Sequence, residues 1–185
     1  MAIILASQSP RRKELLRYLV TDFLIEPADV DETIQPSDEP EDYVMRMAQA
    51  KAAKIAAHHP ADIVIACDTI VVNLGEILGK PVDRKDGYRM LRALSGGVHQ
   101  VFTALVIRQG GQITTALVPA EVTFFELTDE EIQNYLESGE YADKAGAYGI
   151  QGGASLFVKQ IVGDYYSIVG FPVGVVNQLL KKFKS

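Results

Sequence analysis

The sequence predicts an α/β fold from three observations. The chain begins with an apolar run at residues 3–5, which a serine-containing loop and an apolar pattern of helical spacing follow. Residues 63–67 form a continuous apolar run, typical of a central strand that is buried on both faces. Between these two runs, residues 41–58 carry apolar side chains at helical spacing. Alternating strands and helices of this kind indicate an α/β protein.

The first loop has the composition of an anion site. Ser9 is a good N-cap, and Pro10 suits the first helical position, where no backbone donor is needed. The hydroxyls of Ser7 and Ser9, the loop amides and the guanidinium groups of Arg11 and Arg12 all attract a phosphate chain. Cations at a helix N-terminus are unfavourable without an anionic ligand. A solvated basic turn is the alternative, but the density of donors favours the ligand.

The remaining elements follow from periodicity and from turn and capping signals. Helices are expected at residues 10–20, 41–58, 84–94, 128–138 and 172–183, with Asp83 as an N-cap and a capping box at Thr128 and Glu131. Strands are expected at residues 23–26, 63–67, 70–73, 76–78, 98–107 and 113–127, the last two joined at Gly110-Gly111. A second hairpin is expected from residues 156–161 and 165–169.

Two loops are candidates for function. Residues 27–40 are acidic and proline-rich and contain Glu32. Residues 143–153 are rich in glycine and too small-sided for a packed element, and backbone that approaches a ligand closely requires glycine. We therefore expect the second loop to contact a ligand.

Composition excludes several classes of protein. The 185 residues suffice for one large domain or two small lobes, and the net charge of -6 argues against a general nucleic-acid binder. The single cysteine, Cys67, excludes a disulfide framework and suits a reducing cytoplasm. The first apolar run is too short for a signal peptide, and no stretch is long enough to cross a membrane.

Single residues support weaker inferences. Asp68 and Thr69 follow the 63–67 strand, so they are expected at its carboxyl end, where α/β proteins bind ligands. Asp68 would there bind a divalent metal or deprotonate a water, although for a lone aspartate capping the next turn is the commoner case. Lys80 fits a phosphate contact or a solvated lysine equally. A lysine on a helix flank, such as Lys51, and a glutamate in an acidic loop, such as Glu32, are more often solvated than bound to a ligand. The three histidines are assigned no chemistry, and His99 is interpreted as structural.

Five longer motifs stand out: LASQSPRRKELL at 5–16, CDTIV at 67–71, GKP at 79–81, LSG at 94–96 and DKAGAYGIQG at 143–152. Together these motifs resemble the Maf family of nucleoside triphosphate pyrophosphatases, and the resemblance covers nearly the whole chain. The residues 144–152 are similar to the dTTP/UTP branch rather than the 7-methyl-GTP branch. One departure is Cys67, which stands where the family usually has glycine.

The resemblance implies a fold, a cofactor and an assembly. The implied fold is a single mixed α/β domain over residues 1–185. Its elongated twisted sheet is flanked by helices in two lobes around a central cleft, as in the related inosine triphosphatases. The family also implies a divalent cation (Mg²⁺ or Mn²⁺), a homodimer, and an association with nucleotide clean-up and cell division arrest.

The resemblance also implies residue roles. Asp68 matches the catalytic base, and Arg12, Thr69 and Gln151 match positions linked to base choice. Ser9, Arg11, Glu32, Lys51 and Lys80 match other active-site positions.

These inferences combine into one hypothetical mechanism. Basic side chains and the loop that contains Ser7 and Ser9 hold the triphosphate, and Glu32 or Asp68 holds the metal. Asp68, unless it is chiefly a metal ligand, activates a water that attacks the α-phosphorus. Gln151 would read the N3–H and carbonyl edge of uracil or thymine, provided that backbone groups of residues 149–153 hold its amide. A purine clean-up enzyme and a non-catalytic nucleotide-binding regulator remain as alternatives.

Overall fold

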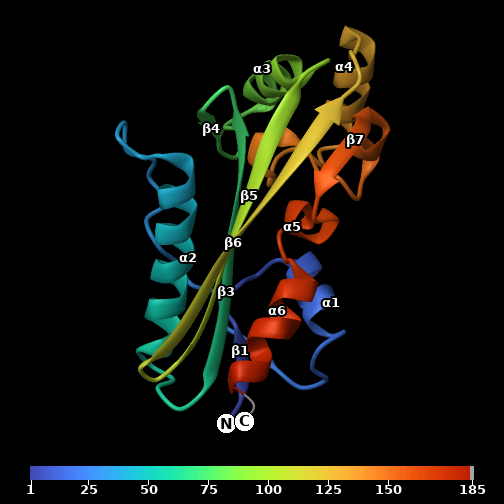
Figure 1. Ribbon diagram of the computed structural model, residues 1–185. Coiled ribbons are helices and arrows are strands. Elements are labelled where there is room, and N and C mark those ends of the chain that lie inside the picture. Colours follow the sequence, from blue (N-terminus) through green and yellow to red (C-terminus); the bar gives the residue numbers. More distant parts are fainter. Residues whose placement is uncertain (184–185) are drawn as a thin grey trace. The chain divides into compact units, whose positions relative to one another are not determined.

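The computed structural model describes residues 1–183, which form a mixed α/β structure with a seven-stranded sheet (Figure 1). The strand order is β2-β1-β3-β5-β6-β7, and β4 pairs with β3 outside this path. The strands are β1 (Ile3–Leu5), β2 (Leu24–Ile25), β3 (Ile63–Asn73), β4 (Glu76–Leu78), β5 (Val98–Gln109), β6 (Gln112–Phe124) and β7 (Val158–Gly163). The α-helices are α1 (Pro10–Leu16), α2 (Pro40–Ala56), α3 (Arg84–Leu94), α4 (Asp129–Glu137), α5 (Tyr165–Val169) and α6 (Val173–Leu180).

The chain divides into two compact units, and β3, β5 and β6 contribute to both. Unit 1 comprises Met1–Asp68, Thr103–Val118 and the chain from Gly170 onward, and unit 2 comprises Thr69–Phe102 and Pro119–Val169. The expectation of a sheet flanked by helices is confirmed.

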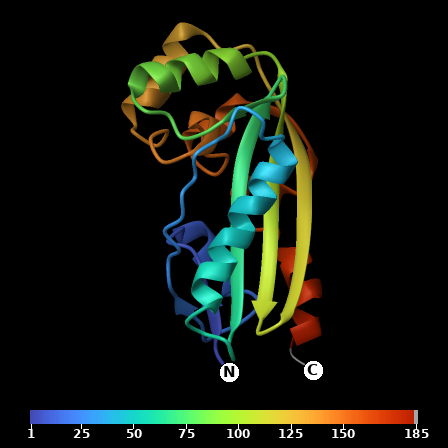
Figure 2. The same ribbon diagram turned by 90° about the vertical axis from the view of Figure 1, so that its left-hand side faces the viewer.

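Unit 1 has helices on both faces of its part of the sheet. Strand β1 lies between β2 and β3 and is parallel to both, with Ile4 opposite Val64. Helix α2 covers one face, while α1 and α6 lie on the other (Figures 1 and 2). Because β1 and this part of β3 are covered on both faces, their apolar side chains are buried in succession.

Unit 2 adds β4 and β7 to the edges of its part of the sheet. Both strands pair antiparallel, β4 with β3 and β7 with β6. Helices α3 and α4 pack against each other, and the Phe124, Leu91 and Leu94 side chains are buried. The predicted capping box of α4 is confirmed, with Thr128 and Glu131 each accepting a bond from the other's backbone.

Two predicted elements were wrong in extent. Residues 70–73 continue extended after the 63–67 run as expected, but both runs belong to one strand, β3, because the backbone ladder continues past the polar side chains of Asp68 and Thr69. Asp68 therefore lies within a strand and not at its end. The first helix stops at Leu16, before the predicted end at residue 20.

The second predicted hairpin does not form. Strand β7 pairs with β6, and residues 165–169 form α5. The Asp164 side chain accepts a hydrogen bond from the backbone N–H of Tyr166 at 2.8 Å, which favours a helical turn after Gly163.

Candidate active site

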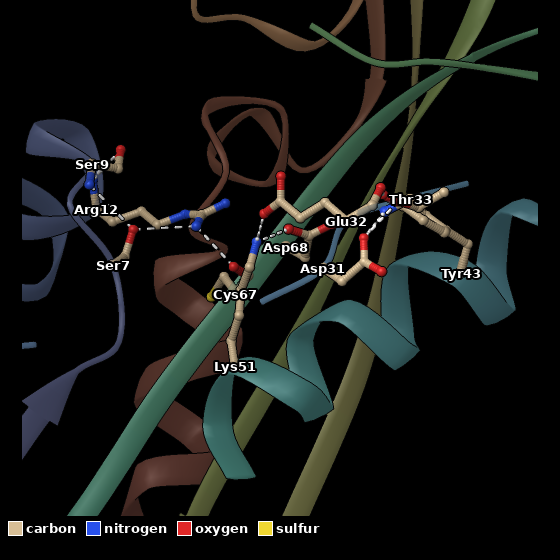
Figure 3. A network of polar contacts seen from close by, with 10 residues as sticks. All are labelled: Ser7, Ser9, Arg12, Asp31, Glu32, Thr33, Tyr43, Lys51, Cys67 and Asp68. Atoms are coloured by element: carbon tan, nitrogen blue, oxygen red, sulfur yellow. Dashed lines mark hydrogen bonds and ion pairs between the residues drawn. The ribbon is translucent and has the colours of Figure 1, made fainter. Parts of the chain in front are cut away.

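A cluster of three charged side chains lies in unit 1 around the Lys51 ammonium. Lys51 projects from α2, and its Nζ lies 2.5 Å from Asp68 Oδ1 on β3 and 2.6 Å from Glu32 Oε1 in the 27–40 loop (Figure 3). Lys51 and Asp68 are each only 9% exposed, so Lys51 is not the solvated surface residue that its helix flank alone favours. The structure thus brings together three predicted site residues that are far apart in the sequence.

The acidic loop is fastened to α2 beside this cluster. The Tyr43 hydroxyl donates to the Glu32 carbonyl at 2.8 Å, and Lys54 Nζ donates to the Asp29 carbonyl. Asp31 accepts bonds from both the backbone and the hydroxyl of Thr33 (Figure 3). These bonds hold the backbone on both sides of Glu32, so its carboxylate is positioned rather than merely solvated.

The electrostatics of Asp68 are set by two opposing effects. Burial raises the pKa of its carboxyl group above the ordinary value, while the Lys51 ammonium and the Arg12 guanidinium act in the opposite direction. A carboxylate of raised pKa accepts a proton more readily than an exposed aspartate does. Asp68 can therefore act as a general base in a largely buried position.

Arg12 joins three segments of unit 1. Its Nε donates to the Gly170 carbonyl at 2.8 Å, and its Nη1 donates to the Cys67 carbonyl at 2.7 Å and to Ser7 Oγ at 3.3 Å. The predicted N-cap is present, since Ser9 Oγ accepts a bond from the Arg12 N–H at 3.4 Å. The first loop is therefore tied to β3 at the residue before Asp68 (Figure 3).

The other predicted site residues lie in unit 2, except Arg11. Thr69 follows Asp68 directly on β3, and Lys80 and Gln151 are exposed in loops. Arg11 is half-buried in the first turn of α1. The site residues that the sequence singled out thus come from both units of the chain.

The glycine-rich loop is more structured than predicted. Residues Ala145–Ala147 form a 3₁₀ turn, and Ala147, Tyr148 and Ile150 are buried. Gly146 adopts φ +66°, and a Cβ at this position would lie 2.9 Å from Val71, so glycine is required there. Within residues 1–183 the Gln151 side chain makes no hydrogen bond, so loop backbone groups do not hold its amide as predicted.

Three supporting residues were missed by sequence reasoning. Tyr43 lies on the apolar stripe of its helix, where the pattern indicates only burial, and no motif marks Tyr135. His99 was interpreted as structural without a partner, whereas its Nε2 lies 2.8 Å from the Tyr148 hydroxyl. Tyr148 is 49 positions away in the chain, so no local pattern signals this pair.

The donor set of the cluster suits a hard divalent cation. Two carboxylate oxygens, from Glu32 and Asp68, converge on one cationic nitrogen. Within the described residues, no group of three or more His, Cys, Asp or Glu side chains is arranged to hold a metal ion. Mg²⁺ is commonly bound by one or two carboxylates together with substrate phosphates, and this arrangement fits that pattern.

The fold agrees with that of a solved structure. A HAM1 protein from Coxiella burnetii superimposes with a TM-score of 0.51, covering 98% of this chain and 100% of that chain, at 13% identity. This similarity defines the fold class as a HAM1-like mixed α/β structure.

The sequence itself identifies the family. The model of the family described as Maf-like protein matches residues 2–183, so the chain belongs to the Maf family. A dTTP/UTP pyrophosphatase of Latilactobacillus sakei is 47% identical over 96% of this chain and 98% of its own length. A dTTP/UTP pyrophosphatase of Hahella chejuensis is 50% identical over 98% of this chain and 92% of its own length.

Proposed function

We propose that this protein is a nucleoside triphosphate pyrophosphatase that hydrolyses dTTP and UTP to the monophosphate and pyrophosphate. The observation that carries the proposal is the Asp68–Lys51–Glu32 cluster in a chain of the Maf family. The two relatives described above, which are named for this activity, support the choice of substrates because they match the chain over nearly its whole length.

In the proposed mechanism, Asp68 accepts a proton from the water that attacks the α-phosphorus. Arg11, Lys51 and Lys80 bind the triphosphate by charge, together with the loop of Ser7 and Ser9. Lys51 contacts both carboxylates in the present structure, and an arriving phosphate offers its ammonium a further anionic partner.

Glu32 and Asp68 are the residues that would hold a divalent cation, Mg²⁺ or Mn²⁺. When bound, the cation supplies Lewis acidity and neutralises phosphate charge. This part of the proposal is tested by titrating Mn²⁺ and measuring its bound fraction by electron paramagnetic resonance. Glu32→Gln should weaken binding, whereas Glu39→Gln, at an exposed position on the same loop, should not.

Base choice is proposed to depend on Gln151, which is held through the loop backbone on either side of it rather than through its amide, with Arg12 and Thr69 as further contributors. Because Arg12 bonds to two backbone carbonyls, its substitution would also disturb the first loop. Gln151→Glu is the cleaner test, since it exchanges an amide donor for an acceptor at an exposed position. It should lower UTP and dTTP turnover far more than CTP turnover, and equal losses would remove Gln151 from base reading.

A panel of nucleotides tests the proposed activity. With Mg²⁺ or Mn²⁺, the kcat/KM for UTP and dTTP should exceed that for CTP by at least roughly ten-fold, since a wrong base leaves polar groups unpaired. Highest activity on inosine triphosphate would instead indicate a purine clean-up enzyme. Binding without any turnover would indicate a nucleotide-binding regulator.

We also propose a cytoplasmic location and a homodimer. The lone buried cysteine suits the reducing cytoplasm. The proposed nucleotide substrates suit the same compartment. None of the helices in residues 1–183 has the length and apolar character to cross a membrane. Light scattering at several protein concentrations would test the dimer.

A further inference from the structure

We propose that Tyr135 and Glu140 are positioning residues that hold the loop backbone on both sides of Gln151. This inference rests on the proposed function, because it concerns how the loop presents Gln151 to a pyrimidine base. Tyr135 lies near the end of α4, and Glu140 follows that helix by three residues. Neither residue was singled out by its sequence pattern.

The loop backbone is bonded two residues before and two residues after Gln151. The Gly149 N–H donates to the Tyr135 hydroxyl at 3.2 Å, and the Gly153 N–H donates to Glu140 Oε2 at 2.9 Å. The exposed Gln151 side chain makes no hydrogen bond of its own within residues 1–183. The place of its amide therefore depends on the backbone that these two bonds hold.

The packing of the loop glycines fits these two bonds. A Cβ on Gly152 would collide with Glu140 Oε2, and a Cβ on Gly153 would lie 3.3 Å from the Tyr135 ring. Glycine at these two positions therefore leaves room for the loop to approach both side chains without displacing them.

A buried aromatic cluster supports the start of the loop. The Tyr135 ring packs edge-on to Phe157 with centroids 5.3 Å apart, and Phe124 contacts both Phe157 and Tyr148. The Tyr148 hydroxyl lies 2.8 Å from His99 Nε2. Because these rings are buried, the Tyr135 hydroxyl has a rigid base from which to hold Gly149.

The test measures the ratio of kcat/KM for UTP to that for CTP. Tyr135→Phe keeps the ring and removes the hydroxyl, and Glu140→Ala removes the carboxylate. Each should lower the ratio by about three- to ten-fold, the change expected from one hydrogen bond, chiefly through a higher KM for UTP. Glu140→Gln should restore the wild-type ratio, because its amide oxygen still accepts from Gly153.

Matched controls lie nearby. Tyr141→Phe removes a hydroxyl and Glu137→Ala an exposed carboxylate from the same region, and both should keep the wild-type ratio. Amide hydrogen exchange, followed by NMR, gives a readout independent of turnover. Tyr135→Phe should speed exchange at Gly149, and Glu140→Ala should speed it at Gly153.

The outcomes separate this inference from the proposed function. If exchange at Gly149 and Gly153 accelerates while the ratio stays constant, the two residues do not position Gln151. Unchanged exchange would show that the two bonds do not hold the loop and would equally overturn the inference. If the wild type hydrolyses neither UTP nor dTTP, the proposed function fails. The inference is then tested by the ratio of the UTP and CTP dissociation constants, measured by calorimetry for the same variants. A ratio that stays constant while exchange accelerates would again overturn it.

Discussion

The buried Asp68 carboxylate combines two properties that a general base needs. Burial raises its pKa, and the Lys51 ammonium at 2.5 Å keeps it from being an isolated buried charge. Without that ammonium, burial would raise the pKa of the Asp68 carboxyl further and favour its protonated form. The pair therefore explains how a carboxylate in the middle of a strand stays available for proton transfer.

Asp68→Asn should reduce kcat by roughly 10²–10⁴, the range for losing a general base, while the fold is retained. Nucleotide affinity should hold or improve, because one negative charge near a polyanion is removed. Steady-state kinetics, with circular dichroism to verify folding, would measure this. Asp42→Asn, at an exposed position on α2, is the control. Activity of Asp68→Asn within a few-fold of wild type would remove Asp68 from the chemistry.

His99 makes a prediction about stability and pH. Burial lowers the pKa of its imidazole to about 4, below the ordinary value of about 6.5 in an unfolded chain. The unfolded chain therefore binds the proton first, so the stability due to neutral His99 is present above about pH 6.5. It is lost as the pH falls through that value towards 4.

Urea unfolding of wild type and His99→Gln measures this effect. Between about pH 7 and about pH 4.5, the free energy of unfolding of the wild type should fall by about 2 kcal/mol more than that of the variant. Comparing the two proteins cancels the titration of the other groups. Parallel pH dependences would show that His99 is not buried in its neutral form.

At the scale of elements, predictions from local patterns were the most accurate. The N-cap of α1, the capping box of α4 and the turn between β5 and β6 each depend on neighbouring residues, and all three are present. The second hairpin failed because a long-range pairing decided it, as β7 pairs with β6 and leaves residues 165–169 to form a helix.

The candidate site was predictable only in part. The residues of the Asp68–Lys51–Glu32 cluster were named from the sequence, but their contacts join an acidic loop, a helix flank and a strand. Lys51 and Asp68 are 17 positions apart, and no periodicity encodes that contact. The supporting tyrosines were missed because an aromatic residue on a helical stripe signals only burial.

The basic residues Arg11 and Lys80 lead to a prediction about substrate range. Arg11→Ala in α1 and Lys80→Ala after β4 should each impair every triphosphate alike, because phosphate contacts carry no information about the base. Values of kcat/KM for UTP, dTTP and CTP should fall by similar factors. Lys85→Ala, on α3, is a matched control that should change none of them. A loss confined to one base would instead assign Arg11 or Lys80 to base recognition.

At the scale of the whole molecule, the chain divides the predicted site residues between two units. Unit 1 contains the Asp68–Lys51–Glu32 cluster and the first loop, and unit 2 contains Lys80 and Gln151. Strand β3 passes from one unit to the other between Asp68 and Thr69. Asp68, the proposed general base, and Thr69, a proposed contributor to nucleobase choice, are thus consecutive on one strand.

Asp68 is proposed to direct water to the α-phosphorus of a pyrimidine nucleoside triphosphate. Hydrolysis of UTP in water enriched in oxygen-18, followed by mass spectrometry of both products, locates the phosphorus that the water attacks. We expect label in the nucleoside monophosphate and none in the pyrophosphate. Label in the pyrophosphate, or release of orthophosphate and UDP, would contradict it.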